Sequence, residues 1–242
     1  MQFGCWAGLA NAFSTEMMGQ AGFDWLVLDA EHGPNDLRTL LTQLQVLEST
    51  DAHPVVRVPV GETYMIKQIL DAGAQTILVP MVESADQARQ LVRDVTYPPH
   101  GDRGVGYALA RASKFSAIAD YGKTADAQIC LLVQVENLRG MAALDDILAI
   151  EGVDGVFIGP ADLAADMGQM GNAEHPDVQA AIMDALARIR AAGKAPGILS
   201  TRDEMTNNAI AAGAQFVAVG ADVLLLGNAA RALASKWQAT RE

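Results

Sequence analysis

The sequence predicts an α/β fold of the (β/α)8 TIM-barrel class, with eight parallel strands at its core. The chain has 242 residues, a length common among such barrels. Short apolar runs alternate strictly with helical patterns, which is typical of parallel strands joined by right-handed crossovers. A recurring phrase runs through residues 21–29, 72–83, 151–162 and 212–222: a glycine, an apolar run, then an acid. The glycine suits a left-handed helix C-cap, and the continuous apolar run suits a strand buried on both faces.

The elements follow one another in a regular order. Apolar runs predict strands near residues 3–8, 25–29, 55–59, 76–81, 129–135, 155–159, 196–200 and 216–220. Helical patterns between them include residues 34–48, 63–72, 85–95, 138–150, 178–192 and 202–212. Eight such units favour a closed barrel over the alternative, an open doubly wound sheet. The first strand is not followed by Gly-x-Gly-x-x-Gly, and no Gly-Lys-Ser/Thr loop occurs, which weakens the nucleotide-binding form of that alternative. We therefore expect one barrel domain over residues 1–242.

Two connections are longer and less regular than the others. One runs from Tyr97 to about Ser113 and is rich in Gly, Pro and Arg; the other runs from Gly168 to Pro176. Connections of this size without regular structure are often functional. We expect that each can border the catalytic face.

Composition narrows the class of partner. Lys plus Arg number 17 against 29 Asp plus Glu, a formal net charge of −12. Such a chain repels phosphate backbones and anionic lipid, so neither nucleic acid nor a membrane surface is an expected partner. No apolar run approaches the roughly 20 residues of a membrane span, and the N-terminus shows no secretory signal pattern. We expect a cytoplasmic protein in which Cys5 and Cys130 are buried, reduced thiols.

Polar side chains follow nearly every apolar run, where a barrel of this kind places its chemistry. Glu136 and Asp162 follow neighbouring strands, so their carboxylates can meet at one place. Two carboxylates can bind Mg²⁺ or Mn²⁺ and leave positions open for water and a chelating substrate. The alternative is that Asp162 caps the following helix. The sequence therefore predicts a hard-metal site.

His32 is the candidate general base, because an imidazole transfers protons near neutral pH. Asp29, close in sequence, or Asp71, at the end of the third helix, could orient it. The alternative is a polar residue in a tight turn.

Arg57 ends a strand and can bind the keto oxygen or carboxylate of a substrate. A structural salt bridge to Glu31 or Glu83 is the alternative.

Backbone N–H groups around Gly159 and Pro160 lie at the start of a helix, where an anion binds well. Leu199 and residues 103–106 are candidates for shaping the aldehyde side. The lysines fall in helices, in the stretch after the 97–113 connection or before a strand, so none is placed for the iminium of a Schiff-base aldolase.

The sequence closely resembles the class II pyruvate aldolases of the HpcH/HpaI aldolase family, typified by 4-hydroxy-2-oxoheptanedioate aldolase, essentially from end to end. The matching segments are 29–36, 55–57, 73–76, 79–82, 97–99, 103–106, 134–136, 155–163 and 194–198. The resemblance implies that Glu136 and Asp162 bind Mg²⁺, Mn²⁺ or a similar ion such as Co²⁺, and that His32 is the base. It also implies that Asp71 or Asp29 raises the basicity of that histidine and that Arg57 stabilises the transition state. Gln134 and Ala161 would contact the 2-oxo acid.

The resemblance further implies a homo-hexamer, a trimer of dimers, whose final helix packs on a neighbouring copy. The expected reaction is reversible cleavage of a 4-hydroxy-2-oxo acid into pyruvate, or hydroxypyruvate, plus an aldehyde, through a metal-bound enolate. Cleavage of 2-dehydro-3-deoxyglucarate or deoxyrhamnonate is a close alternative. A malyl- or citryl-CoA lyase needs a site for a nucleotide tail, for which the sequence offers no basic patch. A non-catalytic 2-oxo-acid binding protein is a third class, against which His32 and Arg57 both argue.

Overall fold

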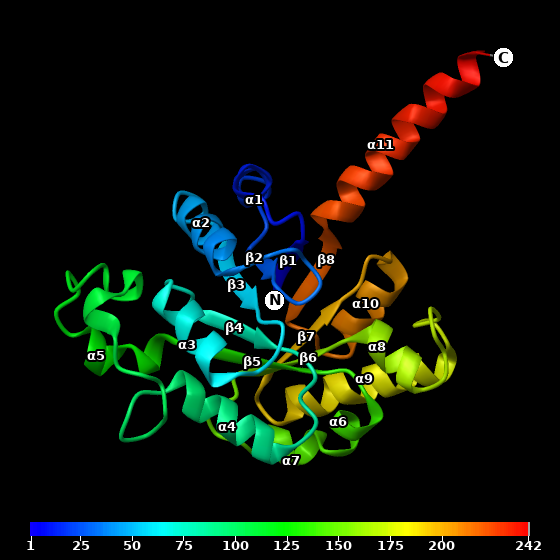
Figure 1. The fold of residues 1–242 in the computed structure, drawn as a ribbon. Helices are drawn as coiled ribbons and strands as arrows, with labels where there is room; N and C mark the ends of the chain where they lie inside the picture. Colours follow the sequence, from blue (N-terminus) through cyan, green and yellow to red (C-terminus); the bar gives the residue numbers. More distant parts are fainter. Residues whose placement is uncertain (242) are drawn as a thin grey trace.

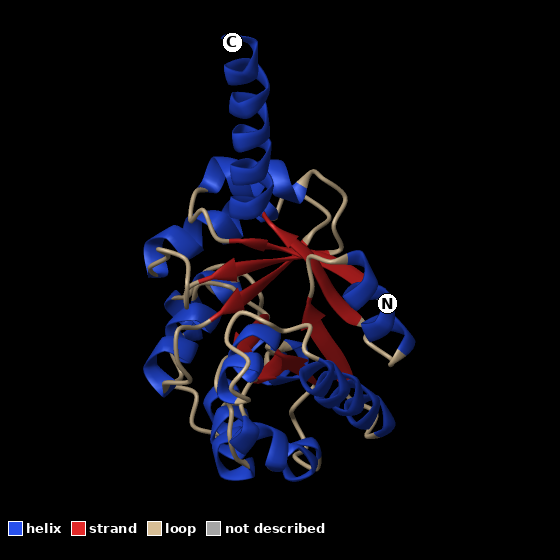
Figure 2. Ribbon diagram, turned by 90° about the vertical axis from the view of Figure 1, so that its right-hand side faces the viewer, coloured by secondary structure: helices blue, strands red, loops and turns tan. Residues whose placement is uncertain are grey.

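Eight parallel strands close into a barrel in the computed structural model, which describes residues 1–241 (Figures 1 and 2). Each strand pairs with its sequence neighbours, and β8 closes on β1. The strands are β1 (Gln2–Ala7), β2 (Trp25–Asp29), β3 (His53–Arg57), β4 (Thr76–Val79), β5 (Cys130–Val135), β6 (Gly155–Ile158), β7 (Ala195–Leu199) and β8 (Phe216–Ala221). The expected closed barrel is confirmed, and the open sheet is excluded.

Helices surround the barrel and occupy the expected places in the chain. They are α1 (Ala12–Gly19), α2 (Leu37–Leu47), α3 (Thr63–Asp71), α4 (Ala85–Val95), α5 (Tyr121–Thr124), α6 (Leu138–Ala142), α7 (Leu144–Leu148), α8 (Pro160–Asp166), α9 (Pro176–Ala191), α10 (Asp203–Ala211) and α11 (Asp222–Gln238). The helix expected at 34–48 begins only at Leu37, because the Asp36 side chain accepts the N–H of Thr39 and caps it. The helix expected at 138–150 is divided into α6 and α7 at Ala143.

Most buried apolar side chains belong to two separate layers, and a third, smaller cluster contains Tyr97, Tyr121 and Ala125. One fills the space between strands and helices, with Leu28, Ile77 and Leu186 fully buried. The other fills the inside of the barrel, where Trp25 stacks on Phe216 with ring centroids 3.7 Å apart. Because side chains fill the barrel, it has no pore, and polar chemistry is confined to its ends.

Glycines end helices as the recurring phrase predicts. Gly73 has φ +106° and Gly213 has φ +110°, a conformation that a side chain would strain. The chain can therefore turn within a few residues from α3 into β4 and from α10 into β8.

The two long connections lie at opposite ends of the barrel. Glu174 in the 168–176 connection forms an ion pair with Arg202, just after β7, so this connection borders the C-terminal ends of the strands as expected. In the other connection, Arg111 donates to the carbonyl of Ala72, just before β4. The expectation that residues 97–113 border the catalytic face of the same chain is therefore wrong. This connection follows α4, and a helix in this fold returns the chain to the N-terminal ends of the strands.

Helix α11 projects away from the barrel (Figure 1). Its apolar side chains include Leu225, Leu226 and Trp237, which are 52%, 60% and 60% exposed. Among the described residues, no helix combines the length and apolar character needed to cross a bilayer.

Candidate active site

Arg57 forms a buried charged group at the C-terminal end of the barrel. It ends β3 beside Asp29, which ends β2 in the same register. Its Nε and Nη2 donate to the two Asp29 carboxylate oxygens at 2.9 and 2.8 Å, and its Nη1 lies 2.8 Å from Glu31 Oε2. The two-pronged contact fixes the plane of the guanidinium. Of the two salt-bridge partners expected as alternatives for Arg57, Glu31 is present, whereas Glu83 binds Arg139.

Trp6 lies below this group and is not among the residues that the sequence predicts for the site. It is 5% exposed at the end of β1, and Arg57 Cζ lies 5.3 Å from its ring centroid. An aromatic face attracts a cation at this distance. The position of Trp6 near the end of a predicted strand could have indicated a site residue. An aromatic ring at such a position is equally typical of the barrel core, so the sequence does not distinguish the two.

Glu136 is held by contacts to both of its carboxylate oxygens. Oε1 accepts the backbone N–H of Met81 at 2.8 Å, and Oε2 accepts a hydrogen bond from the Gln134 amide. A Cβ on Gly159 would lie 2.4 Å from Oε2, so only glycine leaves room for the carboxylate. The carboxylate is therefore fixed before any ligand arrives.

Asp162 lies in the first turn of α8 and lines the same cavity as Glu136, of about 380 Å³. Burial raises the pKa of Glu136 above its ordinary value, and the nearby Asp162 raises it further. The two carboxylates thus lie close enough to repel each other. A cation between them would relieve that repulsion.

A divalent ion fits this donor set. Both groups offer oxygen, the donor atom that Mg²⁺ and Mn²⁺ prefer. Gln134 Oε1 is buried there without a hydrogen-bond partner, and a water on a bound ion could donate to it. Within residues 1–241, no group of three or more His, Cys, Asp or Glu side chains is placed to hold a metal. The pair therefore leaves coordination positions open.

His32 is 70% exposed at the same end of the barrel. Its backbone N–H donates to Asp29 Oδ1, and its Nε2 lies 4.0 Å from Glu31 Oε2. Both Asp29 oxygens accept hydrogen bonds from Arg57. Asp29 therefore holds the backbone of the turn at His32 and does not orient the imidazole ring.

Asp71 does not lie near His32 in the same chain. It ends α3, close to the start of β4, and its Oδ1 accepts from Arg103 Nη2 at 3.2 Å. The expectation that Asp71 reaches His32 across the barrel rim is wrong for a single chain, because α3 carries it to the opposite end of the barrel. Residues 103–106 lie there too, so they do not border this chain's own site.

The expected substrate-binding residues lie at the C-terminal end of the barrel, together with Arg57 and Glu136. The expectation that the backbone around Gly159 and Pro160 binds an anion needs correction. The Gly159 N–H donates to the carbonyl of Val135 at 3.1 Å, and Pro160 has no N–H, so neither is free for an anion. The N–H groups of Ala161 and Asp162 lie in the first turn, without intrahelical acceptors. Leu199 ends β7 half-buried against the barrel interior.

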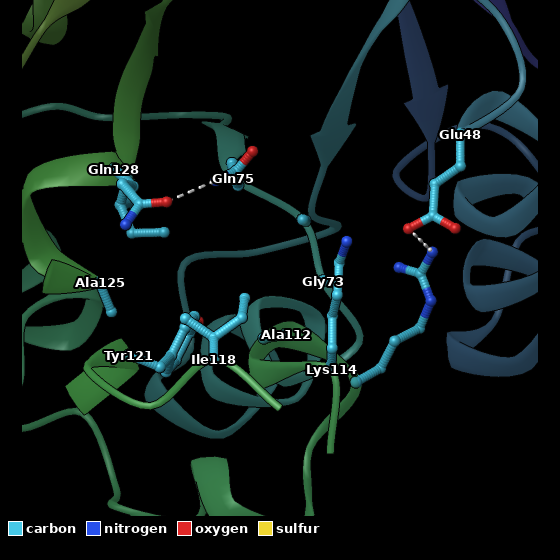
Figure 3. A pocket seen from close by; sticks show the side chains of 12 residues that line it. Glu48, Gly73, Gln75, Ala112, Lys114, Ile118, Tyr121, Ala125 and Gln128 are labelled. Carbon is cyan, nitrogen blue, oxygen red and sulfur yellow. Dashed lines mark hydrogen bonds and ion pairs between the residues drawn. The ribbon is translucent and has the colours of Figure 1, made fainter. Parts of the chain in front are cut away.

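A second cavity lies at the other end of the barrel (Figure 3). Glu48 and Arg111 form an ion pair there, and Gln75 and Gln128 share a hydrogen bond. This cavity lies beside the turn between α3 and β4, away from Glu136, and is separate from the candidate active site.

Comparison with known proteins identifies the family. The family model for HpcH/HpaI aldolase/citrate lyase matches residues 2–229. A hydroxypyruvate/pyruvate aldolase of Roseobacter denitrificans is 58% identical over 236 residues, which cover 98% of this chain and 92% of that protein. A 4-hydroxy-2-oxo-heptane-1,7-dioate aldolase of Shigella sonnei is 54% identical over 238 residues, 98% of this chain and 91% of that protein.

A solved structure agrees with this assignment. A protein from Burkholderia cenocepacia, described as an HpcH/HpaI aldolase/citrate lyase family protein, superposes with a TM-score of 0.93 at 39% identity. The alignment covers all of this chain and 95% of that one. This chain belongs to the HpcH/HpaI aldolase/citrate lyase family.

Proposed function

We propose that this protein catalyses reversible aldol cleavage of 4-hydroxy-2-oxo acids, giving pyruvate or hydroxypyruvate plus an aldehyde. The observation that carries the proposal is the pairing of Glu136 and Asp162 in one cavity, at the end of the barrel where β3 presents Arg57. The names of relatives that match nearly the whole chain support the same reaction.

Glu136 and Asp162 would hold Mg²⁺, Mn²⁺ or a similar ion such as Co²⁺. When bound, such an ion polarises the keto oxygen of a 2-oxo acid. Glu136 keeps its position through the Met81 N–H and the Gln134 amide. The substrate carboxylate can reach the N–H groups of Ala161 and Asp162 at the start of α8.

His32 and Arg57 carry out proton transfer and charge stabilisation during cleavage. His32 accepts the proton of the C4 hydroxyl as the C3–C4 bond breaks and C4 becomes the aldehyde carbon. The electron pair of that bond passes toward the C2 oxygen, where Arg57 stabilises the negative charge. Protonation at C3 then gives the 2-oxo acid, and the reverse sequence is aldol addition.

We also propose a homo-oligomer, a trimer of dimers, in the cytoplasm. The exposed apolar side chains of α11, such as Leu226 and Leu233, support burial on another copy. In such an assembly, Asp71 could orient His32 only as a contact between two copies, because one chain keeps them at opposite ends of its barrel.

The test is pyruvate release from 4-hydroxy-2-oxo acids by metal-stripped protein, coupled to lactate dehydrogenase. We expect release only after Mg²⁺ or Mn²⁺ is added, and its loss in Glu136→Ala and in Asp162→Ala. Asp146→Asn, an exposed carboxylate on α7, is the matched control and should keep full activity. Release that survives chelation, or that persists in both alanine variants, would refute the proposal.

A further inference from the structure

Met81 has a backbone conformation that side chains rarely adopt. Its φ is +55°, in the left-handed region, although it is neither glycine nor asparagine. Such residues persist only where their surroundings impose the conformation, and they gather at functional sites. Met81 lines the cavity that holds Glu136 and Asp162.

The neighbouring hydrogen bonds explain how this conformation is imposed. β4 ends at Val79, and Pro80 has no N–H with which to continue the ladder toward β5. Pairing resumes at Val82, whose N–H donates to the carbonyl of Gln134 at 2.9 Å. Between these points Met81 turns its own N–H onto Glu136 Oε1, at 2.8 Å.

We propose that Met81 is a positioning residue whose left-handed backbone presets Glu136 for the divalent ion. This inference rests on the proposed function, because it requires that Glu136 is a ligand of the ion. The Met81 N–H holds Oε1 and the Gln134 amide holds Oε2, so the carboxylate plane is fixed from two sides. A carboxylate fixed in this way loses less conformational freedom when the ion binds.

The proposal assigns the effect to the backbone of Met81, not to its side chain. The side chain is 44% exposed and lines the cavity, so an apolar side-chain role is the competing explanation. The two explanations rank substitutions differently. Asparagine tolerates the left-handed region but is polar, whereas valine is apolar and, being β-branched, resists that region.

The experiment measures Mn²⁺ affinity by titration calorimetry on the full-length metal-stripped protein, for wild type, Met81→Gly, Met81→Asn and Met81→Val. We expect Met81→Val to weaken Mn²⁺ binding by about tenfold or more, because its N–H turns away from Glu136. Met81→Gly and Met81→Asn should stay within about threefold of wild type. Met81→Ala removes the side chain but keeps an unbranched Cβ, so it should stay within about threefold of wild type, whereas the side-chain explanation expects a loss. Met81→Thr, which is also β-branched, serves if Met81→Val does not fold.

Two outcomes overturn the inference: Met81→Val binding Mn²⁺ as tightly as wild type, or Met81→Asn and Met81→Gly losing as much affinity as Met81→Val. Glu136→Gln and Asp162→Asn separate this failure from that of the proposed function. If both bind Mn²⁺ normally, the metal site itself is wrong. If both weaken binding while Met81→Val does not, only the role of Met81 is wrong.

Discussion

The position of each side chain at this site is set by the groups that it contacts. Arg57 is 7% exposed and contacts two carboxylates and an aromatic ring. These contacts hold the guanidinium in one place, so it can face a substrate anion without rearranging. The geometry of the fork, rather than the charge alone, defines its position.

Arg57→Lys should therefore impair catalysis even though it keeps the charge. Lysine cannot bind both Asp29 oxygens in one plane, so the cation shifts away from the oxygen that becomes negative. We expect kcat/KM for aldol cleavage to fall by about 10²-fold. Retention of wild-type kcat/KM would show that Arg57 has only a structural role.

The two cysteines provide a second prediction at this scale. Burial raises the pKa of Cys5 to about 11 and that of Cys130 to about 12. A raised pKa keeps a thiol neutral and unreactive at pH 8, since only the thiolate attacks disulfide reagents. We expect both thiols of the native protein to react with a colorimetric disulfide slowly at pH 8, and faster only as the pH rises toward 11.

Unfolding in guanidinium at pH 8 is the control for this measurement. It should release both thiols to rapid reaction, because their pKa values return to about 8.5. The structure buries Cys5 fully but Cys130 only partly, so the expectation of two buried thiols holds for Cys5 alone. Rapid reaction of either thiol in the native protein would contradict its raised pKa.

At the scale of elements, the junction between β6 and α8 decides whether the two carboxylates can meet. Gly159 donates its N–H to β5, passes directly beneath Glu136 and leads through Pro160 into the turn that carries Asp162. Because Gly159 has no side chain, the end of β6 can lie close to the end of β5.

Gly159→Ala should displace Glu136 and the end of β5 that carries it. The added Cβ would lie 2.4 Å from Glu136 Oε2 and 2.7 Å from its Cβ, so the carboxylate must move. We expect Mn²⁺ affinity to weaken by about tenfold or more, because the moved carboxylate can no longer share an ion with Asp162. Gly220→Ala is the matched control, since its Cβ would meet only Cys5 Sγ, at an ordinary 3.6 Å. Unchanged Mn²⁺ affinity in Gly159→Ala would show that Glu136 is not held there.

At the scale of the whole molecule, α11 leaves a run of apolar side chains uncovered. This helix projects from the barrel (Figure 2). Four of its leucines, Leu224, Leu225, Leu226 and Leu233, are exposed. Most of the stability of a helix in a protein comes from packing of its apolar face, and the 17-residue α11 lacks such packing along much of its length, which supports the proposed oligomer.

Charge placed on α11 should therefore change the size of the particle in solution. The chain alone has a mass of 25.6 kDa, and we expect wild type to be a multiple of it by light scattering. Leu226→Asp combined with Leu233→Asp should shift the protein toward the single-chain mass, because a buried unpaired charge is costly. Asn228→Asp, a polar position on the same helix, is the control for added charge. A wild-type protein of single-chain mass would refute the oligomer.

The sequence by itself determined the barrel, its eight strands and most of the residues at its C-terminal end. These follow from local patterns: apolar runs mark strands, and polar residues just after them mark the rim. Thus Glu136, Asp162, Arg57 and His32 could all be found without coordinates.

Only the tertiary structure decided which groups meet. It joined Asp29 to Arg57, placed Trp6 beneath that arginine and moved Asp71 to the far end of the barrel. It also revealed the Met81 N–H on Glu136, a contact between residues 55 apart in the chain. Sequence patterns report the environment of each position, whereas hydrogen bonds between strand ends depend on register and backbone conformation. A single turn of helix or one left-handed residue changes which of these groups come within hydrogen-bonding distance.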